Sequence, residues 1–144
     1  MKKIMVINGP NLNRLGKRDP NIYGHETLED IMQEMLNIGR EKNLELDFFQ
    51  SNSEGLIIDT LHKNDIADCI ILNAGAYSHY SIAIRDAIEC IECPVIEVHL
   101  SNIYKRENFR HHSVLSEVCL GQITGFGKES YILALEAFLR MQNK

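Results

Sequence analysis

The sequence predicts an α/β fold with one parallel sheet, because short apolar runs rich in β-branched residues alternate with segments of helical periodicity. Five runs have the length and composition of buried strands: 3–8, 44–50, 68–73, 94–99 and 118–124. Connections between parallel strands are right-handed crossovers, which place helices on both faces of the sheet. Five strands connected in this way predict a flavodoxin-like doubly wound sandwich with strand order 2-1-3-4-5.

Four helices are predicted from apolar periodicity. The first carries its apolar side chains at i, i+3, i+4, i+7 and i+8, on one face: Leu28, Ile31, Met32, Met35 and Leu36. Thr27 and Asp30 have the spacing of a capping box at its start. The same periodicity predicts three more helices, around 56–61, 83–91 and 132–139.

Length and composition are those of one ordinary domain. A chain of 144 residues with 44% apolar side chains fits a single core, and no repeat or linker divides it, so we expect one catalytic domain over 1–144. The net charge of -5 argues against a broad surface for nucleic acids. No apolar run reaches the roughly 18 residues of a membrane span. We therefore expect a cytoplasmic protein that binds neither nucleic acid nor membrane.

The four cysteines do not predict a metal site or a redox site. Cys90 and Cys93 form a CxxC, but it ends a predicted helix, whereas a redox CxxC normally opens one. No second pair completes a zinc site. Cys69 and Cys119 fall within apolar runs, so we interpret the cysteines as free thiols and expect no metal.

The segment 8–24, NGPNLNRLGKRDPNIYG, follows the first strand and is too polar for the core. Loops longer than roughly 12–15 residues are generally functional or disordered. Pro10, Gly16, Pro20 and Gly24 fix or permit particular backbone conformations along it. We interpret residues 9–24 as a mobile active-site lid.

Polar residues follow the strands that meet at the switch point of the sheet, where ligands bind in such folds. Strand 1 ends at Asn8, strand 3 runs into 73–79, and strand 4 runs into 97–101. Amides, imidazoles and hydroxyls gather there, a set suited to proton transfer on a small polyhydroxylated acid. A phosphate-accepting receiver domain would need paired acids after strand 1, where Asn8 stands. A binding module without enzymatic activity is the alternative that the fold alone leaves open.

Five motifs in the same order give the chain a resemblance to type II 3-dehydroquinate dehydratase over nearly its whole length. They are NGPNLNRLGKRDPNIYG (8–24), QSNSEG (50–55), NAGAYSHYS (73–81), IEVHLSN (96–102) and ENFRHHS (107–113). The resemblance implies cofactor-independent anti dehydration of 3-dehydroquinate to 3-dehydroshikimate through an enolate. It also implies a homododecamer built from trimers. The reaction serves aromatic amino acid biosynthesis through the shikimate pathway, and quinate breakdown by the same chemistry is the alternative role.

The resemblance implies catalytic roles for five residues. Tyr23 would be the base, and its ordinary pKa near 10 means that its phenolate needs roughly 3–4 kcal/mol of stabilisation, which the cation Arg18 can supply. Asn11 would orient a water that stabilises the enolate oxygen. His99 would protonate the leaving hydroxyl, and Glu97, on the same strand face, would hold its far nitrogen. A lid tyrosine that only packs, and a core histidine paired to a carboxylate, are the structural alternatives.

The resemblance also implies a set of substrate-binding residues. Three side chains would hold substrate hydroxyls, and two backbone amides with one hydroxyl would hold the carboxylate: Asn73, His79 and Arg110 in the first group, Leu100 and Ser101 in the second. Asp86 would come from a neighbouring subunit, and its spacing from His79 is close to two helical turns. Arg106 is a further cation that could hold an anion locally.

Overall fold

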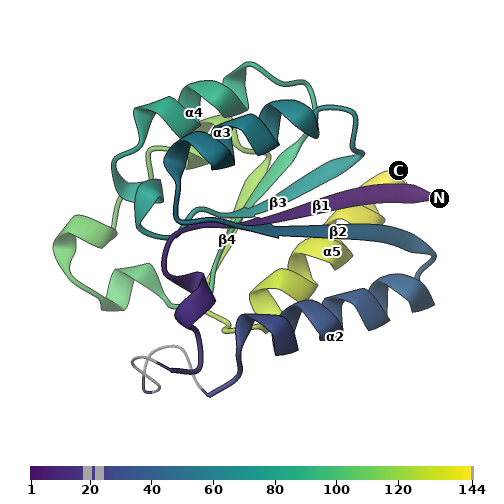
Figure 1. Cartoon of the computed structure of the whole chain (residues 1–144), viewed down its shortest axis with the longest axis horizontal. Coiled ribbons are helices and arrows are strands. Elements are labelled where there is room, and N and C mark those ends of the chain that lie inside the picture. Colours follow the sequence, from purple (N-terminus) through teal and green to yellow (C-terminus); the bar gives the residue numbers. More distant parts are fainter. Residues whose placement is uncertain (18–20, 22–24, 144) are drawn as a thin grey trace.

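The computed structural model describes residues 1–17, 21 and 25–143. Within these residues, five strands form a parallel sheet: β1 (Lys2–Asn8), β2 (Leu44–Gln50), β3 (Cys69–Asn73), β4 (Val95–His99) and β5 (Gly121–Thr124). Their order in the sheet is β2-β1-β3-β4-β5. The predicted fold class and strand order are therefore confirmed (Figure 1).

Helices cover both faces of the sheet (Figure 1). The helices α2 (Leu28–Glu41) and α5 (Glu129–Gln142) lie on one face, and α3 (Glu54–Lys63) and α4 (Ile82–Glu89) lie on the other. No helix in the described part of the chain combines the length and the apolar character that a bilayer crossing requires.

Alternation along the strands produces two apolar cores. In β1, Ile4 and Val6 pack in the core beneath α2 and α5, whereas Met5 and Ile7 pack in the core beneath α3 and α4. Successive strand residues point to opposite faces, and here both faces are covered, so β1 is apolar on both sides.

Side-chain caps fix where the helices begin. The Thr27 hydroxyl accepts a hydrogen bond from Asp30 N, and the Asp30 carboxylate accepts one from Thr27 N, both at 3.1 Å. The predicted capping box is thereby confirmed. Ser53 and Ser81 cap α3 and α4 by accepting a backbone N–H three residues further on.

Two sequence expectations were wrong in detail. The strand predicted over 118–124 begins at Gly121, because Val118 and Cys119 donate their backbone N–H groups to a 3₁₀ turn instead of the sheet. Leu56, the first residue of the apolar period that predicted a helix around 56–61, is 51% exposed and does not belong to its buried face.

The end of β1 lies tightly against the end of β3. Asn8 is in register with Asn73, and the next residue, Gly9, donates its N–H to the Asn73 carbonyl at 2.7 Å. A Cβ on Gly9 would lie 2.6 Å from the Ala74 carbonyl oxygen, closer than atoms can pack. Glycine at this position therefore lets the chain pass from β1 over the carboxyl edge of the sheet.

Candidate active site

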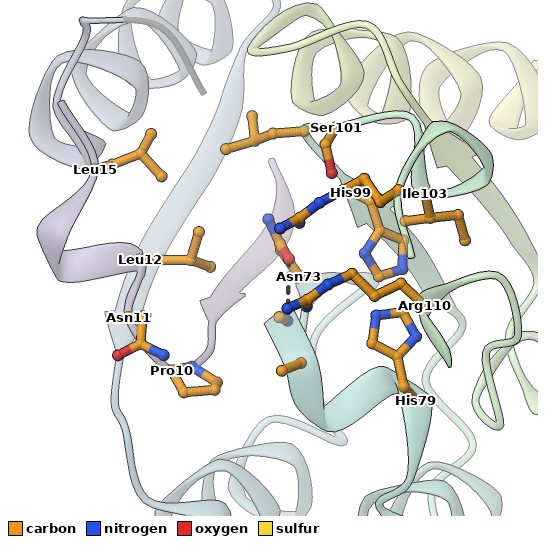
Figure 2. Close-up of a pocket in the computed structure, with 14 residues that line it drawn as sticks. Pro10, Asn11, Leu12, Leu15, Asn73, His79, His99, Ser101, Ile103 and Arg110 are labelled. Atoms are coloured by element: carbon orange, nitrogen blue, oxygen red, sulfur yellow. Dashed lines mark hydrogen bonds between the residues drawn. The ribbon is translucent and has the colours of Figure 1, made fainter. Parts of the chain in front are cut away.

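A pocket of about 120 Å³ lies at the carboxyl edge of the sheet, where β1, β3 and β4 end (Figure 2). One side, here called the strand-end wall, comes from β3, β4 and the loops after them: Asn73, Gly75, Ala76, His79, His99, Leu100, Ser101, Ile103, Arg106 and Arg110. The facing side, here called the lid wall, follows β1: Pro10, Asn11, Leu12 and Leu15. The pocket occupies the switch point between β1 and β3.

His99 ends β4 and is paired with the buried carboxylate of Glu97. The His99 Nε2 atom lies 2.6 Å from Glu97 Oε2, and the Glu97 side chain is fully buried. A carboxylate only accepts hydrogen bonds, so Nε2 carries the hydrogen and donates it. The other ring nitrogen, Nδ1, has no hydrogen bond within the described part of the chain.

Three further donors surround the Glu97 carboxylate. The hydroxyls of Ser113 and Ser116 donate to Oε2 and Oε1 at 2.7 and 2.6 Å, and Gln122 Nε2 donates to Oε2 at 3.2 Å. Burial by itself raises the pKa of Glu97, but the hydrogen bonds and charge of His99, together with the two serines, outweigh it and lower that pKa. Glu97 therefore stays ionised and stabilises a positive charge on His99.

His79 stacks against His99 on the same wall, with ring centroids 6.2 Å apart. Its Nδ1 lies 2.9 Å from the His112 carbonyl oxygen, which can only accept, so Nδ1 carries the hydrogen. Burial is the main cause that lowers the pKa of His79, and the charges of His99 and Arg110 lower it further. A neutral His79 then presents the Nε2 lone pair as an acceptor.

Two arginines add positive charge to the strand-end wall. Arg110 ends the short turn Asn108–Arg110, and its Nε atom lies 3.2 Å from Glu107 Oε2. Figure 2 shows the Arg110 side chain extending into the pocket. Arg106 also lines the pocket, although the sequence analysis identified it only as a cation that could hold an anion and not as a substrate-binding residue. Its position four residues before Arg110 in the same loop is the signal that could have identified it.

The lid wall is held through backbone contacts. Asn11 has the left-handed φ of 68°, which asparagine tolerates better than most residues. Its backbone N–H donates to Asn52 Oδ1 at 2.9 Å, and Gln50 Nε2 donates to the Gly9 carbonyl oxygen at 3.1 Å. Asn52 and Gln50 both belong to the QSNSEG motif. This motif supported the family resemblance, but the sequence predicted no structural role for it.

Six residues predicted to be functional line the pocket with Asn11, and Glu97 lies directly behind one of them. The six are Asn73, His79, His99, Leu100, Ser101 and Arg110. The predictions for Tyr23 and Arg18 lie outside the described residues.

Asp86 lies on the exposed face of α4 and does not line the pocket of its own chain. The spacing argument that joined it to His79 on one helix was wrong. His79 ends a 3₁₀ turn, Tyr80 has the non-helical φ of -153°, and α4 begins only at Ile82.

The two thiols of the CxxC lie in different surroundings. Burial raises the pKa of Cys93 to about 12, and Cys90 is exposed at the end of α4. Among the described residues, no three of His, Cys, Asp and Glu are grouped so that they could hold a metal ion. His111 Nε2 instead contacts the Arg106 carbonyl oxygen at 2.8 Å, which fixes the loop.

Known proteins resemble this chain along almost its whole length. The family model described as dehydroquinase class II matches residues 2–139. A 3-dehydroquinate dehydratase of Bacillus licheniformis is 54% identical over 145 residues, with 100% of both chains covered. One of Caldicellulosiruptor bescii is 55% identical over 139 residues, covering 95% of this chain and 96% of the relative. The crystal structure of a type II dehydroquinase from Butyrivibrio crossotus has a TM-score of 0.93 at 48% identity, covering 95% of this chain and 97% of that one. This chain therefore belongs to the class II dehydroquinase family.

Proposed function

We propose that this protein is a lyase that dehydrates 3-dehydroquinate to 3-dehydroshikimate in the shikimate pathway, through an enolate and without a cofactor. One observation carries the proposal. The chain belongs to the class II dehydroquinase family, and its His99 imidazole lines a pocket together with amide, hydroxyl and guanidinium groups. The buried Glu97 carboxylate holds this imidazole in place.

The first step removes a proton next to the substrate ketone and leaves its electron pair in an enolate. Tyr23 is the proposed base, and Arg18 lowers its pKa by stabilising the phenolate. Asn11 orients a water toward the enolate oxygen, where negative charge develops. The support for Asn11 is its place on the lid wall with a fixed backbone conformation.

The second step expels the hydroxyl from C1. The enolate electrons reform the ketone and create the new carbon–carbon double bond, while protonated His99 donates its Nδ1 hydrogen so that water leaves. Glu97 accepts from Nε2 and stabilises the imidazolium before transfer. One proton is taken by Tyr23 and one is given by His99, so proton exchange with solvent resets both residues.

The strand-end wall binds the rest of the substrate. Arg110, His79 and Asn73 are the proposed partners of the substrate hydroxyls, because all three line the pocket. Leu100 and Ser101 offer backbone N–H groups to the substrate carboxylate, where a charged acceptor strengthens each hydrogen bond.

The test is the rise of enone absorbance when purified protein, treated with a chelator, receives 3-dehydroquinate. We expect turnover by the natural chain and loss of turnover in Tyr23→Phe, with an unchanged unfolding curve. Active Tyr23→Phe would overturn the base assignment. Tight binding of substrate without any turnover would overturn the lyase and favour a binding module of this fold.

We also propose that the active form is a dodecamer built from trimers and that Asp86 completes the site of a neighbouring subunit. Its exposure on α4, away from the pocket of its own chain, supports this arrangement. Light scattering after gel filtration gives the oligomeric state. Asp86→Asn should raise KM without altering that state, and a monomer with full activity would overturn the proposal.

A further inference from the structure

A chain of hydrogen bonds runs through the core beneath the pocket and ends at Asn73. Asn8 Nδ2 donates to Met32 Sδ at 3.5 Å, and Tyr131 Oη donates to Asn8 Oδ1 at 2.5 Å. Asn73 Nδ2 donates to Tyr131 Oη at 2.9 Å, and Gly75 N donates to Asn73 Oδ1 at 3.1 Å. The side chains of the four residues other than Gly75 are buried, so water does not compete for these groups.

The direction of this chain is fixed from both ends. A thioether only accepts, so Asn8 must turn Nδ2 toward Met32 and Oδ1 toward Tyr131. The Tyr131 hydroxyl then donates to Asn8, and its lone pair is left for an N–H of Asn73. At the other end, a backbone N–H only donates, so Gly75 requires the Asn73 oxygen. Both ends therefore demand the same orientation of the Asn73 carboxamide.

Ionisation of the Tyr131 phenol does not disturb these hydrogen-bond directions. Tyr131 is fully buried, and burial raises its pKa above the ordinary tyrosine value despite the opposing hydrogen bond from Asn73. The phenol consequently keeps its hydrogen for Asn8 at neutral pH.

We propose that Tyr131 is a positioning residue that orients the Asn73 carboxamide so that Nδ2, and not Oδ1, meets the substrate. An amide nitrogen has two hydrogens. Asn73 Nδ2 donates one of them to Tyr131 Oη in a hydrogen bond, which leaves the second for the pocket that Asn73 lines. That N–H selects an oxygen acceptor on the ligand, such as a hydroxyl. The inference deepens the proposed function and rests on it for the identity of the ligand.

The test is a double-mutant cycle between Tyr131→Phe and Asn73→Ala. Tyr131→Phe removes only the hydroxyl and keeps the ring in the core. Without this acceptor, Gly75 N alone still orients the Asn73 amide, and we expect KM for 3-dehydroquinate to rise about 10-fold with a smaller change in kcat. In the Asn73→Ala background, Tyr131→Phe should cause no further rise. Tyr104→Phe, at an exposed tyrosine of the loop after β4, is the matched control with unchanged KM.

Equal increases of KM in both backgrounds, or no increase at all, would overturn the positioning role. A second cycle, measured by urea unfolding of the same four proteins, does not depend on activity. If the natural chain shows no turnover, the proposed function fails, and the unfolding cycle still decides the positioning role. Coupled unfolding effects support the Tyr131 and Asn73 contact, whereas additive effects overturn it.

Discussion

The strand-end wall and the lid wall face each other across one pocket but are held by different kinds of contact. On the strand-end wall, Asn73 is buried, as is Glu97 behind His99, and both side chains make hydrogen bonds within the core. On the lid wall, Asn11 is exposed, and its backbone is held by the side chain of Asn52. Just beyond the predicted lid segment 9–24, Glu26 pairs with Lys128 at the surface.

This difference indicates how much free energy is lost when a contact on either wall breaks. A buried polar group left without its partner costs far more than an exposed one, because water cannot replace the lost contact. The described groups with fixed orientations, His99 with Glu97 behind it and Asn73, therefore belong to the strand-end side of the pocket. The exposed contacts of the lid wall can break and reform at low cost, as segments that admit a ligand must. Substitutions on the two walls should accordingly differ in size of effect.

The largest effect is expected for Glu97→Gln. The amide cannot stabilise a positive charge on His99, so kcat should fall by about 10²- to 10⁴-fold, the range for a positioned general acid. Glu45→Gln, at an exposed position of β2, is the matched control and should leave kcat unchanged. Steady-state kinetics by the enone assay measures both. Near-normal kcat in Glu97→Gln would show that the carboxylate has no role in proton donation.

Glu97 should also make the fold sensitive to acid. Its pKa in the folded chain lies below the usual 4.5, so its contribution to stability is present above that value and is lost as pH falls through the folded pKa. The free energy of unfolding of the natural chain should therefore fall more steeply in acid than that of Glu97→Gln. Urea unfolding across a series of pH values measures this, and parallel curves would contradict it.

A moderate effect is expected for Asn52→Ala, which removes the side chain that holds the lid wall at Asn11. Loss of the acceptor for Asn11 N, a contact worth about 0.5–1.5 kcal/mol, should lower kcat by roughly 2- to 12-fold. Asn52→Asp keeps an acceptor oxygen at the same place and should restore most of the rate. If Asn52→Asp loses as much activity as Asn52→Ala, the contact with Asn11 does not govern the rate.

The smallest effect is expected for Lys128→Gln. Lys128 Nζ lies 3.1 Å from carboxylate oxygens of both Glu26 and Glu34, but these pairs are at the surface, where water and salt weaken them. We expect a small decrease in melting temperature that disappears at high salt, and no change in kcat. Lys2→Gln, which breaks an exposed pair with Asp68 away from the pocket, is the control. A loss of activity in Lys128→Gln alone would place this contact among those that the reaction needs.

The sequence was sufficient to predict the strand order and the place of the pocket, because apolar periodicity identifies strands and parallel strands end at one edge. The residues that end these strands, such as Asn73 and His99, could be assigned to the pocket for the same reason. The resemblance added their proposed roles. Loops and local spacing were less informative, as Asp86 and the late start of β5 at Gly121 show.

The surroundings of the pocket residues could not be predicted because they depend on tertiary structure. Ser116 reaches Glu97 from 19 residues away, out of a 3₁₀ turn that no periodic pattern specifies. Gln122, 25 residues away, lies opposite Glu97 on the neighbouring strand β5, through a register that the sequence alone does not specify. The hydroxyl that accepts a hydrogen bond from Asn73 belongs to Tyr131 on the final helix. In the sequence, Tyr131 cannot be told apart from other apolar residues of the core.

Because Asn73 is contacted by Tyr131 of α5, the order of synthesis on the ribosome matters for the pocket. Tyr131 bonds to a residue 123 positions earlier, so the contact forms only when almost all of the described chain has emerged. The first four strands are made well before this, and contacts of such long separation form late because they require the closure of a very large loop. Four of the five strands thus emerge before the residue that contacts Asn73, and docking of the last helix completes the hydrogen-bonded support beneath the pocket.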